Sequence, residues 1–495
     1  MRTKLTFYNM IVSLISQFIF LILSIVFPRL IILVFGSEVN GLTSSINQIL
    51  NIVNLLQAGV VGASIYDMYR PISENNNKLL GTIFYSSKQY FNKLSKIFLF
   101  IGIVFIPLFL LNSKNNISFI EMMLSVFILT LNGAIIFKYV SSYDIIISAH
   151  QKKYILVYSS LIEKIIYYVL LLLVLHLRVH FIFMYLALIC GTLARIIFLN
   201  IYFKKNYYNK IKMYTDQTNY KVKNQYYLLS NQIIQQIIES APTLIISSFY
   251  GLATVSIFSL YNMIVSAFKM IFSTIQNSIS ASFGDLSVSD KNHAQLIFDV
   301  IHLLFINLGQ ITSSCMIVLC IPFIKLYSSG ISDINYINSY LAISMSLLSL
   351  SYCVFMPYNL AINANGEYRS VTRQNFIFGI ISILFAIILS LQNYVFCIFV
   401  FSLFYILSSI DRIKVIQRKI FNISLITHIR RIIMAILIPV IYYFLFNDLV
   451  INTWTVFILY GFIHVLILTL IIIIIDFCFE RKTLMFILTF IKERI

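Results

Sequence analysis

The sequence predicts an all-α integral membrane protein with about fourteen transmembrane helices. Hydrophobic residues make up 60 % of the 495-residue chain, and charged residues only 11 %. The mean hydropathy of +0.90 is well above that of soluble globular proteins. Uncharged segments such as 5–28, 300–323 and 449–475 are long enough to cross a hydrocarbon core about 30 Å thick, which takes roughly 20 helical residues.

Each predicted helix corresponds to one apolar segment. The uncharged segment 374–410 would reach about 55 Å as a single helix at 1.5 Å per residue, so we place a turn near Gln392 and Asn393. Helix length likewise predicts a turn near Tyr250 and Gly251. The predicted spans are 7–34, 40–66, 83–111, 118–149, 154–176, 180–203, 225–249, 252–283, 294–327, 335–364, 373–391, 394–411, 429–446 and 452–477.

The distribution of Lys and Arg predicts the orientation of the chain. With a cytoplasmic amino terminus, only Lys114, Arg178 and Lys325 lie on the outer side, and almost all other cations outside the spans lie inside. This skew follows the positive-inside rule and predicts that both termini are cytoplasmic. Basic inner loops beside anionic lipid headgroups also account for the net charge of +18, so we expect membrane lipids and no nucleic acid as partners.

An internal repeat divides the chain. The segment PRLIILVF from Pro28 is similar to PTLIISSF from Pro242, and one residue later Gly36 pairs with Gly251 at an offset that persists for more than 100 residues. Six helices per copy predict parallel repeats related by an axis along the membrane normal. We therefore expect an N-lobe at 1–215, a C-lobe at 216–415, and two additional helices with a cytoplasmic tail at 416–495.

Five cations fall within the predicted spans, where an Arg or Lys costs about 2.5–3.5 kcal/mol and normally faces protein or a wet cavity. We hypothesise that Arg29, Lys138 and Lys269 line a cationic cavity between the lobes, with Lys164 as a further substrate-binding candidate. Arg29 could instead extend to the outer interface, and Lys164 could pair with a neighbouring acid. The fifth cation, Arg195, is interpreted as an anchor at the inner interface.

Three acids also fall within the spans: Asp144, Glu163 and Glu239. Intramembrane carboxylates often relay ions, so these residues are candidates for a proton or sodium coupling site, but they could equally be partners for the lysines. The six cysteines show no CxxC or Cys/His spacing, which indicates neither a zinc site nor a disulfide framework. We expect no metal and no cofactor, and we assign no role to His150 or His302.

Several segments resemble a known transporter family. They are FPRLIILVFGSEVNGLTSSINQILNIVNLLQAGVVGAS from Phe27, YDMYRPISENNNKLLGTIFYSSKQYF from Tyr66, SAHQKKY from Ser148 and NANGEYR from Asn363. With the predicted 6 + 6 + 2 organisation, the chain resembles Wzx-type polysaccharide and O-antigen flippases of the multidrug/oligosaccharidyl-lipid/polysaccharide (MOP) exporter superfamily.

The resemblance implies a transporter rather than an enzyme. Its substrate would be an undecaprenyl-diphosphate-linked oligosaccharide, moved from the cytoplasmic to the outer leaflet of a bacterial inner membrane by alternating access. Implied partners are this lipid-linked oligosaccharide, membrane lipids and a polysaccharide polymerase or other export machinery, and we expect the flippase itself to be a monomer. A proton or sodium gradient would supply the energy.

Other functions stay open at this point. A multidrug exporter or a lipid II exporter of the same superfamily would share the fold, although the excess of buried cations over acids disfavours cationic drugs. A membrane glycan polymerase would need a large outer loop, which the short predicted loops do not provide. The GxxxxGK[ST] loop of an ATP-driven exporter is absent from the sequence.

Overall fold

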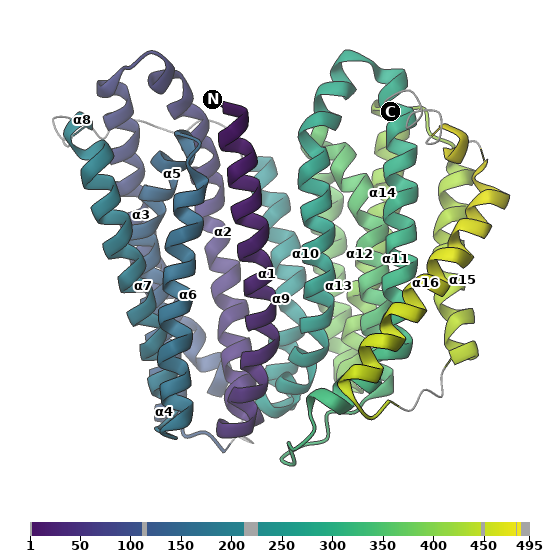
Figure 1. Cartoon of the computed structure of the whole chain (residues 1–495), viewed down its shortest axis with the longest axis horizontal. Helices are drawn as coiled ribbons and strands as arrows, with labels where there is room; N and C mark the ends of the chain where they lie inside the picture. The colour runs from purple at the N-terminus through teal and green to yellow at the C-terminus, as the bar shows by residue number, and fades with distance from the viewer. Residues whose placement is uncertain (1, 111–115, 212–225, 447–450, 482, 487–495) are drawn as a thin grey trace. The chain divides into compact units, whose positions relative to one another are not determined.

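The computed structural model describes residues 2–110, 116–211, 226–446, 451–481 and 483–486, and their regular secondary structure is helical throughout. This confirms the predicted all-α class. The chain divides into two compact units, Met1–Ser256 and Ile257–Ile495. In Figure 1 the first unit is purple to teal, and the second is green to yellow.

The first unit contains ten helical elements, two of which are short π-helical turns within longer helices. They are α1 (Arg2–Phe35), α2 (Ser37–Ser73), α3 (Asn77–Leu110), α4 (Phe119–Ile135), η1 (Ile136–Val140), α5 (Ser141–Ala149), α6 (Lys153–His176), α7 (Ile182–Phe203), η2 (Lys204–Tyr208) and α8 (Asn209–Ile211). It also includes α9 (Tyr226–Tyr250), which packs against α2.

The second unit consists of seven long helices. They are α10 (Leu252–Ser289), whose first turn belongs to the first unit, α11 (Lys291–Tyr327), α12 (Ser339–Ala364), α13 (Tyr368–Ser390), α14 (Tyr394–Lys419), α15 (Leu425–Phe446) and α16 (Trp454–Phe479). Helices α15 and α16 both pack against α11, through a cluster that includes Tyr442, Leu468 and Ile472.

Each predicted span overlaps a long helix, and α4, η1 and α5 together form the fourth. The predicted turns near Gly251 and Asn393 are confirmed. Eleven helices in the described ranges are long and apolar enough to cross a membrane. The helices α2, α3 and α9 are not among those eleven, so fourteen spans stay a prediction that these helices accommodate.

The helices extend beyond the predicted spans at the polar ends. Helix α2 continues to Ser73 and α3 starts at Asn77, where hydropathy predicts an inner loop. An ion pair between Arg70 Nε and Glu74 Oε1, at 2.8 Å, stabilises the last turn of α2 because residues four apart face each other on a helix. Asn76 Oδ1 accepts a hydrogen bond from the Leu79 N–H at 3.0 Å and caps the start of α3.

The predicted repeat has a backbone counterpart. Gly36 and Gly251 have φ angles of 86° and 88°, and Gln151 and Gly366, also 215 residues apart, have φ angles of 60° and 70°. The packing of helices recurs too, because α3 packs on α4 as α11 packs on α12, and α6 packs on α7 as α13 packs on α14. The predicted limit between 215 and 216 lies outside the described residues, and the lobe limits stay a prediction.

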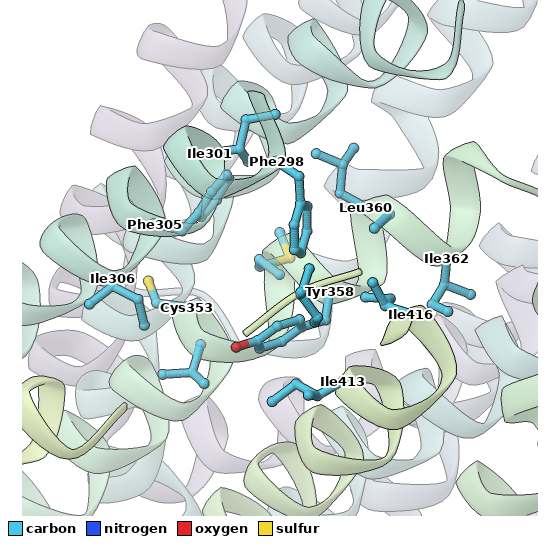
Figure 2. Packing of buried hydrophobic residues seen from close by; sticks show 14 of the residues in the cluster. Phe298, Ile301, Phe305, Ile306, Cys353, Tyr358, Leu360, Ile362, Ile413 and Ile416 are labelled. Carbon is cyan, nitrogen blue, oxygen red and sulfur yellow. The ribbon is translucent and has the colours of Figure 1, made fainter. Parts of the chain in front are cut away.

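A buried hydrophobic cluster in the second unit joins α10, α11, α12, α14 and α15. Figure 2 shows Tyr358 at its centre, with Phe298, Ile413 and Ile416 nearby. In contrast, α16 exposes large apolar side chains on its surface, including Phe462, Leu470 and Ile474. A helix that is apolar around most of its circumference is typical of a membrane span in contact with lipid.

Candidate functional site

Two of the predicted substrate-binding cations lie in different environments of the first unit. Arg29 is half-buried on α1, one residue after Pro28, which lies inside the helix. Lys138 is exposed and lies in the π-helical turn η1, with its Nζ 5.0 Å from the centroid of the Tyr139 ring. Short π-helical turns inside α-helices occur frequently at functional sites.

Three charged residues predicted separately meet in the first unit. Arg195 Nη1 lies 3.0 Å from Glu163 Oε2, and Arg195 Nη2 lies 4.0 Å from Asp144 Oδ1. Glu163 is 6 % exposed, so its carboxylate needs this partner. The interpretation of Arg195 as an interfacial anchor is therefore incomplete, since its guanidinium joins two of the three acids named as ion-coupling candidates.

Small residues on α7 bring this ion pair together. An added Cβ at Gly191 would lie 2.6 Å from the Glu163 carbonyl oxygen, so only glycine permits this approach of α7 to α6. The Thr192 hydroxyl also donates a hydrogen bond to Glu163 Oε1 at 3.3 Å. The backbone packing thus fixes the position of the carboxylate between the two helices.

The remaining two first-unit candidates lie apart from this pair. Lys164 is half-buried, with its Nζ 5.9 Å from the Tyr167 ring centroid, although it follows Glu163 in the sequence. Glu239 is half-buried on α9, next to Ser240, whose hydroxyl donates a hydrogen bond to Gln48 Oε1 of α2 at 3.2 Å. The structure therefore brings together Asp144 and Glu163 of the three predicted acids.

In the second unit, Lys269 on α10 faces two tyrosine rings. Its Nζ lies 4.6 Å from the ring centroid of Tyr352 on α12 and 5.6 Å from that of Tyr405 on α14. The two rings meet edge to face at 5.4 Å. A cation over aromatic faces is stabilised by their quadrupoles, by up to about 2 kcal/mol when water is excluded. Three helices thus hold one ammonium group in a defined aromatic environment.

Arg412 extends this arrangement along α14, although the sequence predicts it in an inner loop. Its side chain is 1 % exposed, and its guanidinium carbon lies 4.3 Å from the Phe355 ring centroid. Arg412 Nη1 donates hydrogen bonds to Asn375 Oδ1 at 3.1 Å and to the Ser408 carbonyl oxygen at 3.2 Å. Helical spacing contains the missed signal, because Tyr405 and Arg412 are seven residues apart and share one face.

A second polar cluster lies where α11, α12, α15 and the end of α16 meet. Arg431 Nη1 donates to His302 Nδ1 at 3.0 Å, and because a guanidinium only donates, this nitrogen accepts. His302 Nε2 then donates to the Tyr358 hydroxyl at 2.7 Å, and that hydroxyl donates to His428 Nδ1 at 3.1 Å. His302, Tyr358 and His428 are each fully buried.

Two acids complete this cluster, to which no role is assigned from the sequence. His428 Nε2 lies 3.5 Å from Asp299 Oδ1, and Arg431 Nη2 donates to Glu480 Oε2 at 2.7 Å. No sequence motif connects these groups, since His302, Tyr358 and Arg431 lie on three separate helices. Their polar types in otherwise apolar segments are the only signal that the sequence offers.

These features define a class: a multi-pass, all-α membrane protein with charged groups inside its helical units. The structure is similar to that of the lipid II flippase MurJ in an inward closed conformation, with a TM-score of 0.68 and 17 % identity over 93 % of this chain and 98 % of that one. It is also similar to an inward-facing multidrug resistance MATE family transporter of the MOP superfamily, with a TM-score of 0.65 and 10 % identity over 78 % of this chain and 93 % of that one.

Both neighbours are members of the MOP superfamily, and the chain has the fold of its flippases and transporters. No protein-family model and no curated protein matches the sequence. At these identities the comparison establishes the fold, and the substrate has to be argued from the charged and aromatic groups.

Proposed function

We propose that the protein is a flippase that moves a polyprenyl-diphosphate-linked oligosaccharide from the cytoplasmic to the outer leaflet by alternating access. The observation that carries the proposal is the environment of Lys269, whose ammonium faces two tyrosine rings inside a helical unit of MOP-type fold. An ammonium attracts phosphate oxygens, and aromatic faces suit the apolar faces of sugar rings or a polyprenyl chain.

Other cations support an anionic substrate. Arg29, Lys138 and Lys164 are the further substrate-binding residues of this proposal, and none of the ion pairs found among the described residues involves Lys138 or Lys164. Keeping cations within membrane helices costs free energy, which binding of a diphosphate would offset. The finer assignment to Wzx-type flippases rests on the sequence resemblance and belongs to this proposal.

The acids of the first unit are proposed to couple transport to an ion gradient. Asp144 and Glu163 share Arg195, so binding of a proton or sodium ion to either carboxylate would release the guanidinium from part of its pairing. Glu239 on α9 is the third candidate. Residues whose pairing changes with ion occupancy are suited to bias a two-state equilibrium.

A lipid II exporter is the second candidate, and one observation favours it: the structural match to MurJ covers 98 % of the MurJ chain. Both candidates present a lipid diphosphate to the protein, and they differ in the sugar. A multidrug exporter is disfavoured because the half-buried Lys269 and the buried Arg412 would repel cationic drugs.

The test is transport by the purified full chain in proteoliposomes. Fluorescent undecaprenyl-diphosphate oligosaccharide, fluorescent lipid II and a cationic dye are compared, each with and without imposed proton and sodium gradients. We expect translocation of the diphosphate lipids and none of the dye. Transport of the dye alone would overturn the proposal, and flipping of lipid II but not of other oligosaccharides would select the second candidate.

A further inference from the structure

A cavity of about 490 Å³ lies in the second unit, beside the buried cluster of His302 and Arg431. It is formed by α11, α15 and the end of α16 with the residues that follow. The lining residues are Leu296, Asp299, Thr427, Arg430, Arg431, Cys478, Phe479, Glu480, Arg481, Thr483 and Phe486. By the predicted orientation, this is the cytoplasmic end of these helices.

The cavity carries more cationic than anionic groups. Three guanidinium groups, of Arg430, Arg431 and Arg481, line it together with two carboxylates. One of these carboxylates, Glu480, is shared, because Arg430 Nη2 and Arg431 Nη2 both donate to it. Arg431 is 3 % exposed, and its Nε has no hydrogen-bond partner among the described residues. Donor capacity therefore exceeds what the protein's own acids satisfy.

The threonines and arginines at this cavity suit a phosphate group. Arg481 is exposed, and the ion pairs found among the described residues do not include it. Thr427 and Thr483 add hydroxyl donors to the lining. Guanidinium groups bind phosphate oxygens through two parallel hydrogen bonds, which a carboxylate-lined or apolar cavity would not provide.

The surroundings of the cavity indicate that the phosphate belongs to a lipid. Ile426 and Ile433 are exposed on α15 at positions four before and three after Arg430, and therefore on the same helix face. On α16, Ile473 and Phe477 are exposed and lie eight and four residues before Arg481. An apolar surface thus leads directly to the arginines, as acyl chains attached to a headgroup would require.

We propose that this cavity binds the phosphodiester headgroup of an anionic phospholipid from the cytoplasmic leaflet. The arginines hold the phosphate, the threonines donate to its oxygens or to the headgroup hydroxyls, and the acyl chains lie along the exposed faces of α15 and α16. Basic pockets between helices on the cytoplasmic side are suited to such headgroups. This site is separate from Lys269 and does not depend on the proposed transport substrate.

The experiment measures lipid binding to the full chain, purified in neutral detergent, by native mass spectrometry. Phosphatidylglycerol is titrated against phosphatidylcholine with the same acyl chains, and glycerol phosphate serves as the soluble anion. Arg481→Gln tests the exposed guanidinium, and Arg430→Gln with Arg481→Gln tests both rim arginines. Arg418→Gln is the matched control, because Arg418 is an exposed arginine at the end of α14 outside the cavity.

We expect phosphatidylglycerol to bind more tightly than phosphatidylcholine. Each guanidinium near the surface contributes a free energy that corresponds to about fivefold in affinity, so we expect a loss of about fivefold for Arg481→Gln and about 30-fold for the double variant. Arg418→Gln should bind as the wild type does. Equal binding of the two lipids, unchanged binding by both cavity variants, or glycerol phosphate binding as tight as that of the lipid would each overturn the proposal.

Discussion

Gly36 and Gly251, 215 residues apart, hold the backbone in nearly the same conformation, with φ angles of 86° and 88°. Each glycine joins two long helices, Gly36 between α1 and α2 and Gly251 between α9 and α10. Positive φ angles of this size are accessible to glycine at little cost and strain any residue with a Cβ. The repeated sequence thus encodes a repeated turn, and the turn fixes how each helix pair begins.

Replacing either glycine by alanine should destabilise the protein. We expect Gly36→Ala and Gly251→Ala each to lower the free energy of unfolding by about 1–2 kcal/mol, because alanine is strained at a positive φ. Thermal unfolding in detergent measures the effect. Gly461→Ala is the control, since Gly461 lies inside α16 with nothing within 4 Å of an added Cβ. Equal melting temperatures for all three variants would refute the strain argument.

The ion pair between Glu163 and Arg195 should behave as a buried pair. Arg195→Gln leaves a carboxylate that is 6 % exposed without its main partner, and we expect a loss of about 3 kcal/mol in the free energy of unfolding. Glu163→Gln combined with Arg195→Gln should cost less than the two single variants together. A matched change, Arg70→Gln, removes an exposed pair with Glu74 and should change the stability little. Additive effects of the two buried substitutions would contradict this pairing.

The hydroxyl of Tyr358 should be essential to the buried cluster of the second unit. Tyr358→Phe would leave His302 Nε2 and His428 Nδ1 without this partner, and we expect a loss of about 1–3 kcal/mol in stability. Tyr66→Phe alters a tyrosine that is 75 % exposed and provides the control. Thermal unfolding distinguishes the two, and no difference between them would argue against the hydrogen-bond chain.

Much of the fold could be predicted from the sequence because hydrocarbon imposes simple length and polarity limits on a helix. The turns near Gly251 and Asn393 follow from helix length alone. The polar ends of α2 and α3 are predicted as a loop instead, because hydropathy reports burial in lipid and not the helix propensity of residues such as Arg70 and Glu74.

The candidate site was less predictable, since charge partners depend on tertiary packing. The ion pair of Arg195 with Glu163 depends on the close approach at Gly191 and Thr192. Arg412 falls in a predicted loop although its spacing from Tyr405 places it on a buried face. The partners of His302 come from other helices, and a single sequence does not contain that information.

The aromatic environment of Lys269 should affect transport. Tyr405→Phe keeps a ring face for the ammonium, whereas Tyr405→Leu removes it. If cation–aromatic attraction positions Lys269, we expect flipping in proteoliposomes to fall about 5- to 30-fold more for the leucine than for the phenylalanine variant, which corresponds to about 1–2 kcal/mol. The same rate for both variants would indicate that the ring plays no such part.

The central claim is that cations inside the membrane helices bind a lipid-linked diphosphate. The most direct measurement is the rate of flipping of undecaprenyl-diphosphate oligosaccharide by Lys269→Ala and Arg29→Ala, reconstituted at equal protein amounts beside Arg418→Gln. We predict a loss of at least about tenfold for each of the first two variants, because each removes a cation that has to hold the phosphate. Arg418→Gln should keep the wild-type rate. Full transport by both Lys269→Ala and Arg29→Ala would contradict the account.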